Sequence, residues 1–86
     1  MEAFCRAVAP ELAPRRINVV SPGFIDTPMF GNDMDQRERM LSGVTAGHVI
    51  PRPGTAEEVA SAILFLIKND FVTGTTVDVD GGWLLS

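Results

Sequence analysis

The most constraining feature of this chain is a short apolar segment that runs directly into a Pro-Gly turn. Residues 17–21 are rich in β-branched side chains and predict a buried strand, which Pro22 and Gly23 end. Ligands of open α/β sheets bind outside the carboxyl ends of strands, so the turn and the following Ile25 and Thr27 form a candidate ligand site. In this interpretation Pro22 keeps the backbone rigid and Gly23 lets a ligand approach it. A turn that binds nothing is the alternative, because Pro-Gly turns are common.

The N-terminal residues have the spacing of an amphipathic helix. Its apolar face would consist of Met1, Phe4, Cys5, Val8 and Leu12. Pro10 is expected to kink or fray this helix and Pro14 to stop it, because proline lacks the N–H donor and its ring clashes with the preceding turn. Arg15 and Arg16 would then lie at the negative end of the helix dipole.

A second, shorter helix is predicted after the turn. Asp33 with Gln36 is a helix-start signal, and the pattern indicates a helix from Met34 to about Ser42. Its inward residues would be Met40, Leu41 and Val44. The Gly and Pro residues between positions 43 and 54 indicate a loop, which we expect to be mobile.

The third predicted helix has the clearest start. Thr55 and Glu58 form a capping box, in which each side chain bonds the backbone N–H of the other residue. The residues that follow are apolar nearly all round, which predicts burial on more than one side. Lys68 suits the C-terminal end, and Asn69 is the expected left-handed cap.

The last predicted element is an edge strand. Residues 75–80 alternate, with Val77 and Val79 on one face and polar residues on the other. The order helix, parallel strand, short helix and loop, helix, edge strand predicts an α/β fold with a single βαβ unit and a right-handed crossover. We expect residues 1–86 to form a single partial domain, since the length lies below that of most domains.

Composition excludes several classes of function. The net charge is -4 and the basic residues form no stripe, so nucleic-acid binding is not expected. The longest apolar run, residues 62–67, is too short to cross a membrane, and no signal-peptide pattern opens the chain. Cys5 is the only cysteine, which rules out an intrachain disulfide. These features predict a cytoplasmic protein.

Three isolated residues invite a functional interpretation, but each has a simpler one. His48 has no second histidine to share a metal, so we expect a solvated or locally hydrogen-bonded side chain. Cys5 is expected to be a small buried group. Trp83 would pack on its own sheet or on a neighbouring subunit.

A second marker lies near the end of the chain, where residues 72–79 lead into Asp80, Gly81 and Gly82. Together with the strand, the Pro-Gly turn and Thr27, it resembles the C-terminal third of the short-chain dehydrogenase/reductase family. The resemblance starts just after that family's Tyr-x-x-x-Lys motif, covers essentially the whole chain and implies a partial Rossmann-like fold.

The resemblance also implies a cofactor site. It places Pro22, Gly23, Ile25 and Thr27 in the loop that binds the nicotinamide side of NAD or NADP. In the family, the residue at the position of Ile25 holds the carboxamide through its backbone. The hydroxyl at the position of Thr27 lies near the carboxamide or the pyrophosphate.

The catalytic and nucleotide-binding motifs of this family do not occur in the sequence. The chain has no Tyr and no Gly-rich dinucleotide fingerprint, and the family's catalytic Lys would fall just before Met1. We therefore expect no catalytic residue and no metal ligand in this chain. We also expect that the chain alone binds no cofactor and has no activity.

Two interpretations of function stay open. In the first, the chain is the C-terminal part of an NAD(P)-dependent short-chain oxidoreductase that interconverts alcohols and ketones, and it contributes the nicotinamide-side loop and a substrate lid. In the second, it is a non-catalytic association module built on the same fold. Both leave an apolar helix and a strand edge uncovered, so we expect a homo-oligomer or a missing N-terminal portion as partner. The substrate and the choice between NAD and NADP stay open.

Overall fold

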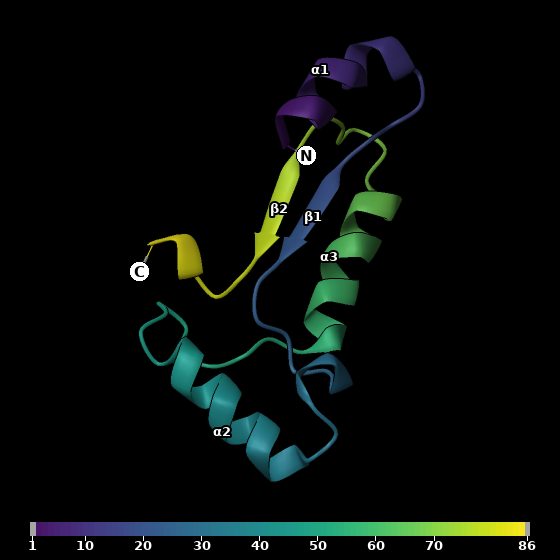
Figure 1. Ribbon diagram of the computed structural model, residues 1–86. Coiled ribbons are helices and arrows are strands. Elements are labelled where there is room, and N and C mark those ends of the chain that lie inside the picture. Colours follow the sequence, from purple (N-terminus) through teal and green to yellow (C-terminus); the bar gives the residue numbers. More distant parts are fainter. Residues whose placement is uncertain (1, 86) are drawn as a thin grey trace.

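The computed structural model describes residues 2–85, and its elements follow the predicted order (Figure 1). The helices are α1 (Glu2–Leu12), α2 (Met34–Thr45) and α3 (Ala56–Lys68), and the strands are β1 (Val19–Pro22) and β2 (Thr76–Val79). Short 3-10 turns, η1 (Pro28–Phe30) and η2 (Trp83–Leu85), follow the two strands. The molecule is elongated, with extents of 46 × 24 × 18 Å.

The two strands pair in parallel, with Val19 opposite Thr76 and Pro22 opposite Val79. Helix α3 lies alongside them and contacts both, while α1 and α2 lie at opposite ends of the strands (Figure 1). This confirms an α/β fold built on one βαβ unit. No helix within residues 2–85 is long and apolar enough to span a membrane.

Strand β1 is less buried than predicted. Val19 and Val20 are half-buried, and Ser21 is exposed. Strand β2 covers one edge of β1 and α3 covers one face, but no other strand of the described chain pairs with β1. The prediction of a fully buried strand was therefore wrong for residues 2–85. Asp78 of β2 is exposed beside half-buried Val77 and Val79, as an edge strand requires.

Helix α1 buries one residue. Cys5 is 1% exposed, and its thiol donates to the carbonyl oxygen of Ile17 at 3.4 Å, which agrees with a small buried group. Pro10 lies inside the helix, which continues to Leu12. On the predicted apolar face Val8 is half-buried, whereas Phe4 and Leu12 are 61% and 37% exposed, so this face is only partly covered. Met1, the first residue of that face, lies outside the described residues.

Arg16 caps a different helix from the predicted one. Its guanidinium donates to the carbonyl oxygens of Leu66 at 2.6 Å, Ile67 at 3.0 Å and Asn69 at 3.1 Å. The carbonyls of Leu66 and Ile67 lie in the last turn of α3, which leaves them without an intrahelical partner, and Asn69 is the C-cap residue. Asn69 itself has an extended backbone (φ -94°, ψ 102°), so the expected left-handed cap was wrong. The arginine satisfies the helix end instead.

Helix α2 continues past Ser42 to Thr45. Leu41 is fully buried as predicted, and the Thr45 hydroxyl donates to its carbonyl oxygen at 2.7 Å. Met40 and Val44 were wrongly predicted to point inward, since they are 43% and 46% exposed. The inward face is formed by Leu41 and Thr45, one turn apart.

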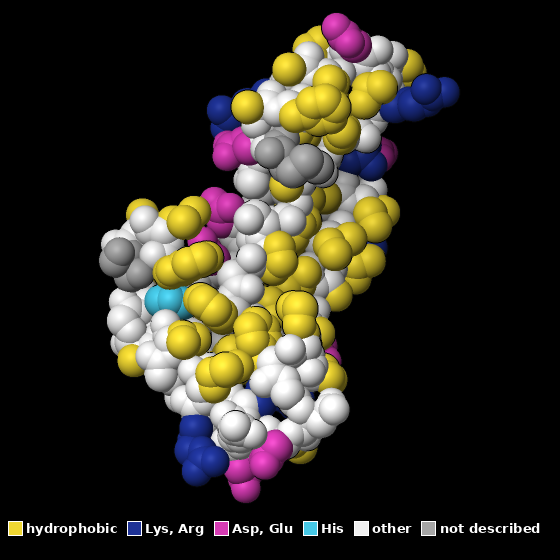
Figure 2. Space-filling view, in the orientation of Figure 1, with side chains coloured by type: hydrophobic (Ala, Val, Ile, Leu, Met, Phe, Trp, Pro, Cys, Tyr) yellow, Lys and Arg dark blue, Asp and Glu magenta, His cyan; other side chains and the backbone are white. Residues whose placement is uncertain are grey.

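The capping box of α3 is present as predicted. The N–H of Glu58 donates to the Thr55 hydroxyl at 3.2 Å, and the N–H of Thr55 donates to the Glu58 carboxylate at 2.9 Å. Leu66 is the one buried residue of the helix. Val59 is half-buried, and the other large apolar residues of the helix are 43–61% exposed. Hydrophobic side chains cover much of the molecular face shown in Figure 2.

Candidate functional site

The four residues predicted to bind a ligand meet at one cavity. This cavity, of about 300 Å³, lies beyond the end of β1 and beside the start of α3. Its lining consists of Pro22, Gly23, Ile25, Thr27, Met29, Phe30, Ala56 and Val59. We call it the turn cavity. The sequence missed its apolar walls from η1 and α3, because these come from other segments of the chain. Their role in binding stays a prediction.

Thr27 carries the clearest mark of a binding residue. Its hydroxyl oxygen is buried and has no hydrogen-bond partner among the described residues. Thr27 occupies the N-cap position of η1, yet its side chain makes no capping hydrogen bond. A buried hydroxyl without a partner is costly, and such groups are rare in folded proteins. The hydroxyl is therefore free to bond a group that enters the turn cavity.

The backbone of Ile25 is also directed toward a possible ligand. Gly54 donates to the carbonyl oxygen of Phe24 and accepts from the N–H of Asp26, both at 2.9 Å. These bonds form a parallel bridge between Ile25 and Gly54. In such a bridge the flanking residues make the hydrogen bonds, so the N–H and carbonyl of Ile25 itself point to the opposite side. This leaves them available to a ligand.

Gly23 is required by the sheet. A Cβ atom at this position would lie 2.9 Å from both Cα and Cβ of Asp80. The N–H of Gly23 donates to the carbonyl oxygen of Val79 at 2.9 Å. The close approach of Asp80 is therefore one reason for a glycine at this position, and the approach of a ligand to Gly23, which also lines the turn cavity, stays a prediction.

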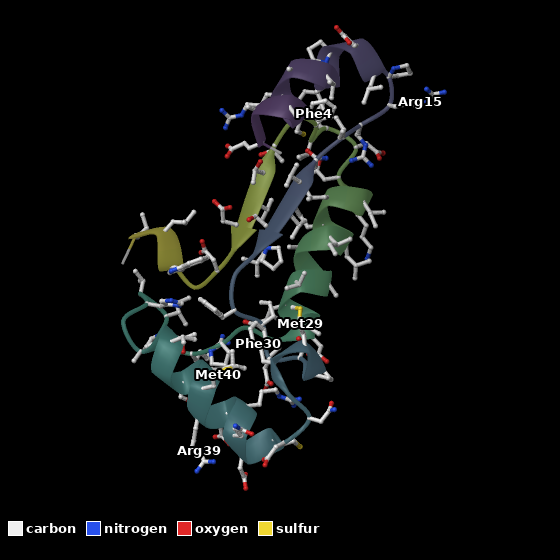
Figure 3. The ribbon with its side chains drawn as sticks, viewed as in Figure 1. Phe4, Arg15, Met29, Phe30, Arg39 and Met40 are labelled. Atoms are coloured by element: carbon white, nitrogen blue, oxygen red, sulfur yellow. The ribbon has the colours of Figure 1, made fainter. Side chains whose placement is uncertain are left out.

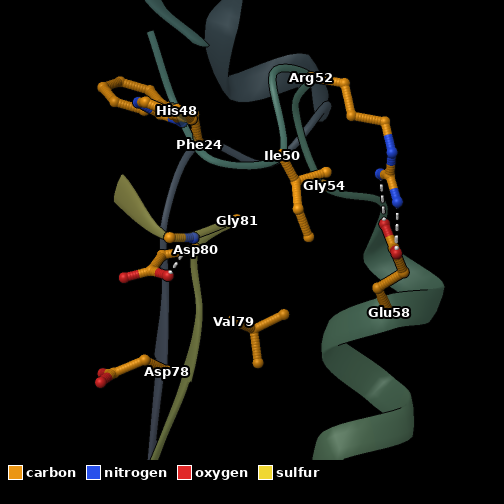
Figure 4. Close-up of a pocket in the computed structure, with 11 residues that line it drawn as sticks. Phe24, His48, Ile50, Arg52, Gly54, Glu58, Asp78, Val79, Asp80 and Gly81 are labelled. Atoms are coloured by element: carbon orange, nitrogen blue, oxygen red, sulfur yellow. Dashed lines mark hydrogen bonds and ion pairs between the residues drawn. The ribbon is translucent and has the colours of Figure 1, made fainter. Parts of the chain in front are cut away.

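A second cavity of about 300 Å³ lies between the end of β2, the 48–54 loop and the start of α3 (Figure 4). Arg52 and Glu58 pair there through two hydrogen bonds of 2.9 Å. The hydrogen bond from Arg52 lowers the pKa of Glu58 to about 2. Because the two charges neutralise each other, we interpret this pair as structural: Arg52 holds the Glu58 carboxylate in the position that completes the capping box of α3.

An aromatic cluster closes one side of this second cavity. The ring of Phe24 lies 5.2 Å from that of Trp83 and 6.0 Å from that of His48. His48 is only 9% exposed, so the solvated alternative predicted for it was wrong, and a local hydrogen bond of its side chain stays a prediction. Trp83 packs against its own chain, in line with one of its two predicted placements. No group of three His, Cys, Asp or Glu side chains within residues 2–85 is arranged to hold a metal ion.

Comparison with known proteins identifies the class. A family model described as enoyl-(acyl carrier protein) reductase matches residues 1–84. The chain is 43% identical over 91 residues to the 3-oxoacyl-[acyl-carrier-protein] reductase FabG of Pseudomonas aeruginosa. The match covers 100% of this chain and 35% of that protein. The chain is 39% identical over 85 residues to the short-chain dehydrogenase/reductase ATR9 of Stachybotrys chlorohalonatus, covering 99% of this chain and 34% of the relative.

Solved structures agree with this assignment. A small-chain dehydrogenase in complex with NADPH matches with a TM-score of 0.84 and 41% identity, over 99% of this chain and 39% of that one. The aldohexose dehydrogenase of Thermoplasma acidophilum matches with a TM-score of 0.83 and 34% identity, over 99% and 38%. The chain belongs to the short-chain dehydrogenase/reductase family, and it spans about a third of the length of the curated relatives it matches.

Proposed function

We propose that this chain supplies the nicotinamide-side loop and the substrate lid of an NAD(P)-dependent oxidoreductase that interconverts alcohols and ketones. The observation that carries the proposal is the buried, unpartnered hydroxyl of Thr27 in the turn cavity. The P. aeruginosa relative is named as a reductase of a 3-oxoacyl group, and one structural relative holds NADPH. Both names support the reaction class for the protein to which this chain contributes.

The residues of the turn cavity fit the nicotinamide end of such a cofactor. A carboxamide offers both donors and acceptors, which match the free N–H and carbonyl of Ile25 and the hydroxyl of Thr27. The apolar walls formed by Met29, Phe30 and Val59 suit the flat ring and exclude water. When bound, the nicotinamide would supply or accept the hydride. Proton transfer is assigned to a residue outside this chain.

A further segment is needed to complete the sheet. Val19 and Gly23 donate to β2, so in this parallel ladder the N–H and carbonyl of Val20 point to the free edge of β1. A cavity of about 320 Å³ lies beside that edge, lined by Arg16, Asn18, Val20, Ile63, Leu66 and Ile67. We propose that the N-terminal portion found in the relatives pairs with this edge and covers these apolar residues.

The C-terminal end of the chain favours the second candidate, a non-catalytic association module. Leu84 and Leu85 of η2 are 71% and 83% exposed. Large apolar side chains that are exposed together are typical of an interaction site. A second copy of the chain could cover these side chains whether or not a cofactor binds. A measurement of cofactor binding therefore separates the two candidates.

The test is a titration with NADPH. A chimera is made in which residues 1–86 replace the matching C-terminal part of the P. aeruginosa reductase. We expect this chimera to bind NADPH, and we expect Thr27→Val to weaken binding about fivefold, the effect of one lost hydrogen bond. Thr76→Val is the matched control, because its hydroxyl is also buried and unpartnered but does not line the turn cavity.

The three outcomes are distinct. A loss of affinity in Thr27→Val but not in Thr76→Val supports the proposed site. A correctly folded chimera that binds no NADPH contradicts the proposed function and favours the association module. Equal affinities in all three proteins would show that the Thr27 hydroxyl does not contact the cofactor.

A further inference from the structure

The loop that carries Ile25 and Thr27 is tied to helix α2 by one side chain. The Nε atom of Arg37 lies 2.8 Å from the carboxylate of Asp26, and an Nη atom donates to the carbonyl oxygen of Gly31 at 3.0 Å. The arginine side chain is 13% exposed, whereas the Asp26 side chain is 49% exposed, so the arginine side of this contact is shielded from water and the carboxylate side is open to it. A single guanidinium therefore holds both ends of the 26–31 segment.

The position of Asp26 gives this contact its significance. Asp26 lies between Ile25, whose backbone is directed away from Gly54, and Thr27, whose hydroxyl is unpartnered. The bridge to Gly54 holds the loop on one side, and Arg37 holds it on the other. The guanidinium fixes orientation as well as distance, because it pairs with the Asp26 carboxylate and donates to the Gly31 carbonyl oxygen at the same time. Without it, the segment after Asp26 would keep only the short hydrogen bonds of η1.

The start of α2 presents Arg37 to the loop. The Asp33 carboxylate accepts hydrogen bonds from the N–H groups of Asp35 and Gln36 at 3.0 and 3.2 Å. Its carbonyl oxygen accepts from the N–H of Arg37 at 2.9 Å. The first turn of α2 is thus fixed locally. Arg39 of the same helix is exposed and points away from the loop (Figure 3).

We propose that Arg37 is a positioning residue, which holds the Ile25–Thr27 loop in its cofactor-binding shape and couples that loop to helix α2 of the substrate lid. This inference rests on the proposed function. Movement of α2 over a substrate would be transmitted to the loop through the Arg37–Asp26 contact, and an ordered loop would in turn favour one position of α2.

The experiment is a double-mutant cycle in the chimera described above. Arg37→Met, Asp26→Asn and the double variant are compared with the parent for NADPH affinity. Amide hydrogen exchange of residues 24–31 is measured in the same proteins without cofactor. Arg39→Met is the matched control, since it removes an exposed arginine from the same helix.

We expect Arg37→Met to weaken NADPH binding about tenfold and to speed exchange in residues 24–31. Asp26→Asn should have a smaller effect in the same direction, and the double variant should be no worse than Arg37→Met. Arg39→Met should change neither quantity. Should Arg37→Met fail to fold, the exposed substitution Asp26→Asn carries the test alone.

The failures of the two proposals are distinguishable. A parent chimera that binds NADPH, with variants of Arg37 and Asp26 that bind equally well, overturns the positioning role and leaves the proposed function in place. A parent chimera that binds no NADPH overturns the proposed function and with it the role of Arg37 toward the cofactor. Slower or unchanged exchange in Arg37→Met overturns the tether itself.

Discussion

Replacing Arg16 by methionine should destabilise the C-terminal end of α3 and lower the free energy of unfolding, although Arg16 lies far from that helix in sequence. Methionine keeps an unbranched apolar side chain in place of the aliphatic part of arginine but removes hydrogen bonds to Leu66 at 2.6 Å and Ile67 at 3.0 Å. A hydrogen bond from a charged group contributes roughly 1.5–3 kcal/mol. The Arg16 side chain is 27% exposed, so solvent screens part of this. Asp70, at 3.9 Å and 97% exposed, adds little.

We therefore expect a loss of about 2 kcal/mol in the free energy of unfolding, near the lower end for such bonds. Urea unfolding at a fixed protein concentration measures it, because association would make the midpoint depend on concentration. Arg15→Met is the matched control, since Arg15 is exposed and points away from α3 (Figure 3). Arg16→Lys, which keeps the charge but loses the fork, should fall between the two. Equal midpoints for Arg15→Met and Arg16→Met would refute the reasoning.

Three further predictions concern the sheet, pH and association. Gly23→Ala should lower the free energy of unfolding by about 1–3 kcal/mol in urea titrations, because its Cβ would lie 2.9 Å from the Asp80 Cα; an unchanged midpoint would contradict this. The pKa of Glu58 is lowered to about 2, so its stabilising effect should be present above its usual pKa of 4.5 and fade as pH falls toward 2. The free energy of unfolding of the parent and of Glu58→Gln, measured as a function of pH, checks this. A difference between the two proteins that stays constant as pH falls would count against it. The chain alone should form a homo-oligomer that Ile63→Asp disrupts; sedimentation showing a folded monomer at high concentration would exclude it.

The sequence predicted best those features that depend on neighbouring residues. The Thr55–Glu58 capping box is a local exchange of hydrogen bonds, and it appears as expected. The end of β1 was also predicted to within a residue or two, although Pro22 is the last residue of the strand and the chain bends only at Phe24. Local rules need no knowledge of the rest of the fold.

Features that depend on distant residues were missed. Arg16 was assigned to the end of α1 because that helix is adjacent in sequence, whereas the chain folds back to bring it to α3. His48 was expected to be solvated or locally hydrogen-bonded, since nothing in its own segment shows that Phe24 and Trp83 converge on it. The contact between Arg37 and Asp26 likewise depends on how α2 returns over the loop. Such contacts are fixed by tertiary packing, which a single sequence does not reveal.

The central claim is that this chain forms the cofactor side of a short-chain oxidoreductase and relies on another segment for proton transfer. The most direct measurement is NADPH-dependent reduction of a panel of ketones, by the 86-residue chain alone and by the chimera with the P. aeruginosa reductase. The account predicts no turnover by the chain alone and clear turnover by the chimera. Turnover by the chain alone, or a folded chimera that binds NADPH but has no activity, would contradict it.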